Sequence, residues 1–251
     1  MSLLEAVAVF IAGMAAGTIN TIVGAGTLVT FPTLVAVGYP PVLANVSNTV
    51  GLVPGSLSGA LGYLPELAGQ SRRLTRLGIG SAAGALTGGL LLLWLPESAF
   101  STVVPALIGL GCVLVVAQPW ISSRVSRSPV APEHGSTLVW VLVFAAGVYG
   151  GYFGAAQGVL LIAILGLGLN ETMQRANAAK NVLALVVNGV AAALFIVISD
   201  VSWRAAGIIA LGSVLGGQLG ARVGRRLPAP VFRTMVAVIG AVAIVKLVWF
   251  D

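Results

Sequence analysis

Long apolar segments, separated by short polar or glycine-rich breaks, make up this chain. Ten segments can be read from the pattern, five in each half. They cover residues 3–23, 27–38, 42–65, 74–95 and 98–119, and then residues 138–154, 157–169, 173–199, 205–221 and 229–249. A helix needs about 20 mostly apolar residues to cross a bilayer. The second segment of each half is too short for this, and we expect these two segments to be half-helices or re-entrant.

The composition excludes a water-soluble domain. Apolar residues make up 58% of the chain and charged residues 8%, and the mean hydropathy is +1.04. Soluble domains carry about 25% charged residues. A membrane β-barrel would need alternating segments of about ten residues, whereas these apolar runs are unbroken. The sequence therefore predicts an all-α polytopic protein of the cell membrane, and Glu5 favours a first membrane segment over a cleaved signal peptide at the N-terminus.

Charge and reactive residues exclude several function classes. The net charge of +6 comes from basic residues in short loops, which is typical of topology-setting loops rather than nucleic-acid binding. Cys112 and His134 are the only residues of their kinds, and the carboxylates lie near segment ends or in loops. An enzyme would need a converging acid, base or metal set. We expect no catalytic residue, no metal and no cofactor.

The chain is an internal duplication. Adding 130 to Gly17 and Gly24 gives Gly147 and Gly154. Adding 132 to Ala44, Asn45 and Val50 gives Ala176, Asn177 and Val182, and the same offset continues to Phe100 and Phe232. We expect a first repeat at residues 1–121, a cytoplasmic linker at 122–137 and a second repeat at 138–251.

Loop charges predict that the repeats are inverted. The first repeat has Arg72, Arg73 and Arg76 between its third and fourth segments, whereas the second has Arg222, Arg225 and Arg226 between its fourth and fifth. Positive loops stay in the cytoplasm, so corresponding loops face opposite sides. Five spans per repeat, or three if each opening pair is a re-entrant hairpin, both satisfy this inversion.

Glycine breaks mark the expected substrate site. Gly24-Ala25-Gly26-Thr27 interrupts the first repeat, and residues 147–158 hold five glycines in the second. Transporters with inverted repeats bind substrate where interrupted helices meet near the midplane. The N–H groups at a broken helix start, with the positive end of the helix dipole, suit an anion.

Polar residues within apolar runs gather near these breaks in both repeats. The residues that we expect to bind substrate are Asn20, Thr27, Asn45, Asn48, Gln157, Asn177, Lys180 and Asn181. For any one amide the alternative is a structural hydrogen bond between helices. For Lys180 the alternatives are a charge in the substrate pathway and a side chain that snorkels to the cytoplasmic interface.

The fourth segment of each repeat carries glycines four residues apart, at Gly80, Gly84 and Gly88 and at Gly212, Gly216 and Gly220. Such glycines form a packing face between membrane helices. A sliding surface between the repeats is the functional alternative.

Taken together, these motifs resemble the sulfite exporter TauE/SafE family of membrane transporters. The resemblance rests on the turn at Gly24-Ala25-Gly26 with Pro32, on residues 44–48, and on residues 150–155 with 177–181. It covers essentially the whole chain, although Ala25 stands within the family's usual run of three glycines. The resemblance implies export or uptake of sulfite, sulfonates, sulfoacetate or other small organic anions.

We therefore expect a transporter that moves a small anion, such as a sulfur oxyanion or organosulfonate, across the cell membrane by alternating access. Its partners would be this substrate and the lipid bilayer, without nucleic acid, and a homo-oligomer is left open. The alternative is a non-transporting membrane scaffold or assembly protein, which would explain the glycine faces but not the paired polar clusters.

Overall fold

The structure is a computed structural model that describes residues 1–123, 135–223, 234, 238, 239 and 241. Most of the expected linker and nearly all of the tenth segment lie outside the described residues. The helices are α1 (Leu3–Ile22), α2 (Thr27–Ala36), α3 (Pro41–Leu61), the 3₁₀-helix η1 (Leu64–Leu67), α4 (Ser71–Trp94), α5 (Glu97–Ser123), α6 (Thr137–Tyr152), α7 (Gln157–Gly168), α8 (Met173–Ile198) and α9 (Trp203–Val223). The all-α prediction is confirmed, and the described part contains no strand.

Five of the described helices, α1, α4, α5, α8 and α9, are long and apolar enough to cross a membrane. This confirms a multi-pass membrane protein. The second helix of each half is short, with 10 residues in α2 and 12 in α7. The expectation of short second segments is therefore also confirmed.

Local sequence signals set the ends of the first helix in each half. Ser2 and Glu5 form a capping box at the start of α1, with Ser2 N–H donating to Glu5 Oε2 over 2.6 Å. At the other end, Gly24 adopts φ +88° and its N–H donates to Ile19 O, 2.9 Å away. In the second half, Gly154 adopts φ +77° and its N–H donates to Tyr149 O over 3.1 Å. Glycine ends both helices because it adopts this left-handed conformation without strain.

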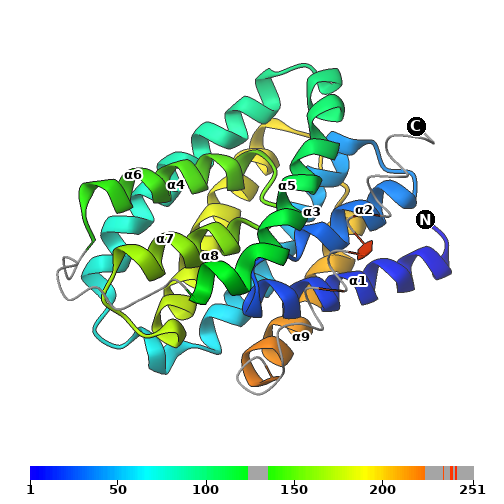
Figure 1. The fold of residues 1–251 in the computed structure, drawn as a ribbon. Coiled ribbons are helices and arrows are strands. Elements are labelled where there is room, and N and C mark those ends of the chain that lie inside the picture. Colours follow the sequence, from blue (N-terminus) through cyan, green and yellow to red (C-terminus); the bar gives the residue numbers. More distant parts are fainter. Residues whose placement is uncertain (124–134, 224–233, 235–237, 240, 242–251) are drawn as a thin grey trace.

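The glycine stripes are packing faces between the two halves. On α4, a methyl group at Gly84 would collide with Phe144 O of α6; on α9, one at Gly216 would collide with Met14 O of α1. Gly216 lies 132 residues after Gly84, and Phe144 lies 130 residues after Met14, so the same contact is made twice. Figure 1 shows α4 beside α6 and α1 beside α9. The packing role is confirmed, and sliding stays a prediction.

The corresponding helices α3 and α8 run in opposite directions. Near the start of α3, Ser47 Oγ accepts a 2.9 Å hydrogen bond from Ser202 N–H, which follows the end of α8. Beyond the end of α3, Gln70 Nε2 donates to Arg175 O near the start of α8 over 3.3 Å. This antiparallel packing supports inverted repeats, whose orientation in the bilayer stays a prediction.

Three aromatic rings pack beside the two breaks. Phe31 of α2 contacts Phe153, which follows α6, edge to face with ring centroids 5.2 Å apart. Phe100 of α5 lies 6.0 Å from Phe153 by the same measure. All three side chains are buried. The core therefore reaches the broken segments and holds them in place.

Candidate substrate site

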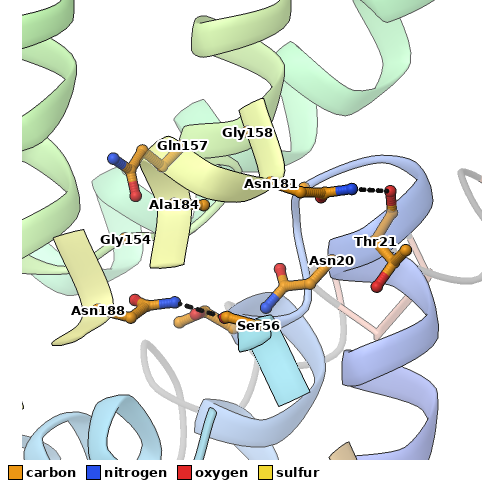
Figure 2. A pocket seen from close by; sticks show the side chains of 11 residues that line it. Asn20, Thr21, Ser56, Gly154, Gln157, Gly158, Asn181, Ala184 and Asn188 are labelled. Atoms are coloured by element: carbon orange, nitrogen blue, oxygen red, sulfur yellow. Dashed lines mark hydrogen bonds between the residues drawn. The ribbon is translucent and has the colours of Figure 1, made fainter. Parts of the chain in front are cut away.

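A polar cavity lies where the breaks of the two halves come together. Its walls come from α1, α3, α7, α8, the first residue of α2 and the two breaks, and Figure 2 shows most of the lining side chains. The lining residues are Asn20, Thr21, Gly24, Thr27, Ser56, Gly154, Gln157, Gly158, Asn181, Ala184 and Asn188. The space open to the centre of a water molecule is about 20 Å³, which suits about one water-sized guest. The cavity is therefore small.

The two breaks touch through their main chains. Gly158 N–H donates to Gly24 O over 3.0 Å. A methyl group added to either glycine would meet the Cα atom of the other. Glycine is therefore required at both positions, because only a residue without Cβ lets the two backbones come this close.

Both short helices begin at the cavity. Thr27 is the first residue of α2, and Gln157 and Gly158 are the first two residues of α7. All three line the cavity. The positive ends of two helix dipoles are thus directed at one small space, which favours a negatively charged guest.

Four of the eight residues expected from the sequence line this cavity, namely Asn20, Thr27, Gln157 and Asn181. Asn20 Oδ1 accepts a 2.7 Å hydrogen bond from Gly26 N–H and so fixes the turn between α1 and α2. Figure 2 shows the amide of Asn20 directed into the cavity. This residue therefore both shapes the break and lines the site.

Gln157 offers an uncommitted donor. Its side chain is buried, and its Nε2 has no hydrogen-bond partner among the described residues. The amide packs on Gly150, where a methyl group would come within 2.6 Å of Nε2. Because an unpaired buried N–H costs free energy, this amide is ready to donate to a ligand.

Asn45 and Asn177, at equivalent positions of α3 and α8, lie behind the cavity rather than in it. Asn45 Nδ2 donates to Tyr152 O at the end of α6 over 3.0 Å. Asn177 Nδ2 donates to Thr21 O at the end of α1 over 3.3 Å. Each amide thus ties one half to the end of the other half's first helix. Their described contacts are those of the structural alternative.

Asn48 also contacts the break from outside the cavity. Its Oδ1 accepts a hydrogen bond from Thr30 Oγ1, and its Nδ2 lies 3.4 Å from Thr27 Oγ1. Asn48 therefore joins α3 to the first turn of α2. It positions Thr27, which does line the cavity.

Lys180 points toward the main chain of α1. Its Nζ donates to Asn20 O over 2.8 Å and to Thr21 O over 3.2 Å, and the residue is 0% exposed. The snorkelling alternative is wrong, because the side chain runs into the bundle and not to an interface. Lys180 does not line the cavity, but it holds the backbone of Asn20, which does.

The structure adds Ser56 and Asn188 to the site. Asn188 Nδ2 donates to Ser56 Oγ over 3.0 Å, and Figure 2 shows this pair on one side of the cavity. The sequence contained a signal for them, since both are polar residues in apolar runs and are separated by the repeat offset of 132. Ser56 and Asn188 occupy equivalent positions in the two repeats, so their hydrogen bond shows where the two halves face each other.

Among the residues that the structure describes, no charged side chain lines this cavity. Among the described carboxylates, Glu5, Glu66 and Glu97 lie at helix starts or in η1, and Glu171 and Asp200 lie in loops. Within the described part of the chain, no three His, Cys, Asp or Glu side chains gather as they would around a metal ion. The chemistry of the cavity is therefore that of neutral hydrogen-bond groups and helix ends.

A polar cavity at broken helices, inside a bundle in which five of the described helices are long and apolar enough to cross a membrane, is typical of multi-pass membrane transporters. The model of the family described as "Sulfite exporter TauE/SafE" matches residues 9–247. The chain belongs to this family, and as a member it is a membrane transporter.

Curated relatives carry transporter names. A "Probable membrane transporter protein" of Haemophilus influenzae is 27% identical over 244 residues, which cover 96% of this chain and 93% of the relative. The Escherichia coli K12 protein "Probable membrane transporter protein YfcA" is 26% identical over 251 residues, with 96% and 88% covered. A third relative, from a Sinorhizobium species, is 26% identical and named "Probable membrane transporter protein ORF9".

Proposed function

We propose that this transporter moves a small oxyanion, such as sulfite, a sulfonate or sulfoacetate, across the cell membrane by alternating access. The observation that carries the proposal is that α2 and α7 both begin at one cavity. Their positive dipole ends favour an anion, and the description of the family, sulfite exporter, supports this class of substrate.

The neutral donors around the cavity suit the oxygen atoms of such an anion. Gln157 Nε2 is uncommitted, and Thr27 and Ser56 add hydroxyl groups. In an enclosed site a hydrogen bond to a charged partner is worth about 1.5–3 kcal/mol. A few such bonds, together with the two helix ends, would hold a sulfur oxyanion without a salt bridge.

The small volume of the cavity requires a change of conformation during the transport cycle. With about 20 Å³ open to water centres, an anion larger than water requires the two halves to separate. In alternating access such separation opens the site to one side at a time. An inside-negative membrane potential favours anion exit by about 2.3 kcal/mol per charge per 100 mV, so export needs no coupling carboxylate.

The test is uptake of labelled sulfite and of a labelled sulfonate into proteoliposomes that hold the purified protein. We expect saturable flux in the wild type. Gln157→Ala should raise KM roughly tenfold to hundredfold, because one hydrogen bond to the anion is lost. Gln174→Ala is the matched control, because Gln174 is exposed at the start of α8.

Two outcomes would count against the proposal. Equal, substrate-independent leak in the wild type and both variants would favour a scaffold. A KM that is the same in wild type and Gln157→Ala would place the anion elsewhere in the bundle.

A further inference from the structure

Three donors of α8 converge on the last turn of α1. Lys180 Nζ lies 2.8 Å from Asn20 O and 3.2 Å from Thr21 O. The amides of Asn177 and Asn181 also donate to Thr21 O, over 3.3 and 3.4 Å. Carbonyls in the last turn of a helix lack intrahelical partners and carry the negative end of its dipole.

Such a helix end is where transporters built from inverted repeats hold a coupling cation. In those proteins, unwound carbonyls and the C-terminal ends of half-helices coordinate Na⁺ or take part in proton binding. Here α1 ends at the break beside the cavity, and an ammonium already occupies its carbonyls.

We propose that the Lys180 ammonium is a built-in cation that fills a coupling-ion site at the C-terminal end of α1, so that transport needs no bound Na⁺. This inference rests on the proposed function, because the ammonium offsets the negative end of α1 beside the proposed anion site. The negative end of α1 would otherwise face the anion across the residues Asn20 and Thr21.

The charges around Lys180 support this assignment. Of the elements packed against α8, α3 and α7 contain no charged residue, and α6 contains only Tyr149 and Tyr152 as titratable groups. On α1 the one charged side chain is Glu5, at the opposite end of the helix from Asn20. The charged residues of η1 and α4 lie in η1 and in the first two turns of α4, and they are Glu66, Arg72, Arg73 and Arg76. In the described part of the chain, no ion pair joins Lys180 to a carboxylate.

The other half shows that this charge is not a general packing device. The position equivalent to Lys180, 132 residues earlier, is Asn48, which bonds to Thr27 and Thr30 of α2. At the end of α6, Tyr152 O accepts from the neutral amide of Asn45. Among the described residues, an ammonium thus binds one of the two equivalent helix ends, the one whose last turn carries Asn20 of the cavity.

Lys180 is a positioning residue in this scheme, because it acts on the anion through Asn20. Its hydrogen bond holds the main chain of Asn20, whose Oδ1 holds Gly26 N–H at 2.7 Å. Loss of the ammonium should therefore disturb both the charge balance and the turn that leads to Thr27.

The test separates cation binding from transport by using two readouts on purified full-length protein. The first is the thermal unfolding temperature with added methylammonium, with NaCl, and with choline as a cation too large for the site. We expect Lys180→Ala to unfold at a lower temperature than wild type and to regain stability as methylammonium is added, since a ligand stabilises the state that binds it. Wild type and Lys180→Met, in which a side chain fills the space, should gain no more from methylammonium than from choline.

The second readout is anion flux in proteoliposomes. Wild-type flux should be the same in NaCl and choline chloride. Lys180→Met should lower flux about tenfold or more, because an interaction with a charged group is lost, and methylammonium should restore flux in Lys180→Ala but not in Lys180→Met. Lys180→Gln, which keeps a donor and lacks the charge, is the second variant should Lys180→Ala not fold, and its flux should fall as in Lys180→Met.

Unchanged flux in Lys180→Met or Lys180→Gln would overturn the inference, as would equal effects of methylammonium and choline on the stability of Lys180→Ala. Wild-type flux that depends on Na⁺ would overturn it too. Absence of flux in the wild type would instead contradict the proposed function, while the stability readout would still decide whether the cation site exists.

Discussion

At the scale of single residues, Gly24 and Gly158 set how closely the two breaks approach. Each lies where a Cβ atom would meet the other's Cα, and Gly24 also has φ +88°. The hydrogen bond from Gly158 N–H to Gly24 O depends on this approach. The shape of the cavity therefore depends on the absence of a side chain at both positions.

Gly158→Ala tests this contact. We expect a loss of stability of about 1–3 kcal/mol, the usual cost of inserting a methyl group into close packing, and a large fall in anion flux because the breaks are pushed apart. Thermal unfolding and proteoliposome flux measure the two effects. Gly189→Ala is the control, because a Cβ there meets nothing within 4 Å and alanine favours the helix; similar losses in both variants would contradict the prediction.

Gly150 controls a second residue of the site. Its missing Cβ leaves room for the Gln157 amide, whose Nε2 would lie 2.6 Å from an added methyl group. We expect Gly150→Ala to displace this amide and raise KM with less effect on the maximal rate. The measurement is the concentration dependence of flux beside Gln157→Ala, and a double variant that is no worse than either single one would show that both act on one group.

At the scale of helices, an ion-pair cluster ties the two halves together at one end of the bundle. Arg73 Nη1 of α4 lies 2.8 Å from Glu171 Oε1 in the loop before α8, and Arg175 Nε lies 2.7 Å from Glu171 Oε2. Gln70 accepts a hydrogen bond from Arg73 in this cluster. The repeat equivalents of Gln70 and Glu171 are Ser202 and Tyr39, at the opposite end of the bundle. Ser202 Oγ donates a 3.2 Å hydrogen bond to Tyr39 Oη. Described ion pairs thus join the two halves at one end of the bundle, whereas this pair of equivalent residues is neutral.

Acid should weaken the charged end. Burial alone would raise the pKa of the Glu171 carboxyl, but the hydrogen bonds and charges of Arg175 and Arg73 outweigh burial and hold this pKa below its usual value. A carboxyl with a lowered pKa stabilises the fold above its unfolded-state pKa, and this stabilisation disappears as the pH falls through the folded-state value.

We therefore expect Glu171→Gln to unfold at a lower temperature than wild type at neutral pH, and the difference to shrink as the pH falls toward and below the usual carboxyl range. Thermal unfolding as a function of pH measures this difference. Glu97→Gln is the matched control, because Glu97 is exposed at the start of α5. A difference that stays constant from neutral to acid pH would contradict the role of the ion pair.

At the scale of the whole molecule, the antiparallel course of α3 and α8 leads to a prediction about orientation. If the halves are inverted in the bilayer, the loop before α4 is cytoplasmic and the loop before α9 is external. With Cys112 replaced by alanine, we expect Asp200→Cys to react with an impermeant thiol reagent added to intact cells. Ser71→Cys should react only after the membrane is opened, and reaction of both from the same side would rule out inversion.

Which elements form, and where they break, followed from the sequence. Apolar length predicted membrane-crossing helices, and the second segments were short as expected, because in lipid the backbone must satisfy its own hydrogen bonds and glycines such as Gly24 and Gly154 end a helix locally. The repeat offset also placed Asn45 and Asn177 at equivalent positions, and in the structure each binds the end of the other half's first helix.

What the sequence could not settle is which polar side chains share one space. Asn177, Lys180 and Asn181 lie within two turns of one helix, yet only Asn181 lines the cavity. Likewise, Ser56 and Asn188 are polar residues far apart in the chain, and they meet only where α3 and α8 cross.

The sequence by itself determined the all-helical membrane fold, the duplication and the positions of both breaks, because lipid and backbone hydrogen bonding act on short stretches of chain. The tertiary structure alone decided that Gly24 meets Gly158, that Thr27 and Gln157 begin two helices at one cavity, and that Lys180 binds the end of α1. These arrangements bring together residues more than a hundred positions apart, and they depend on how close-packed helices cross rather than on any local pattern.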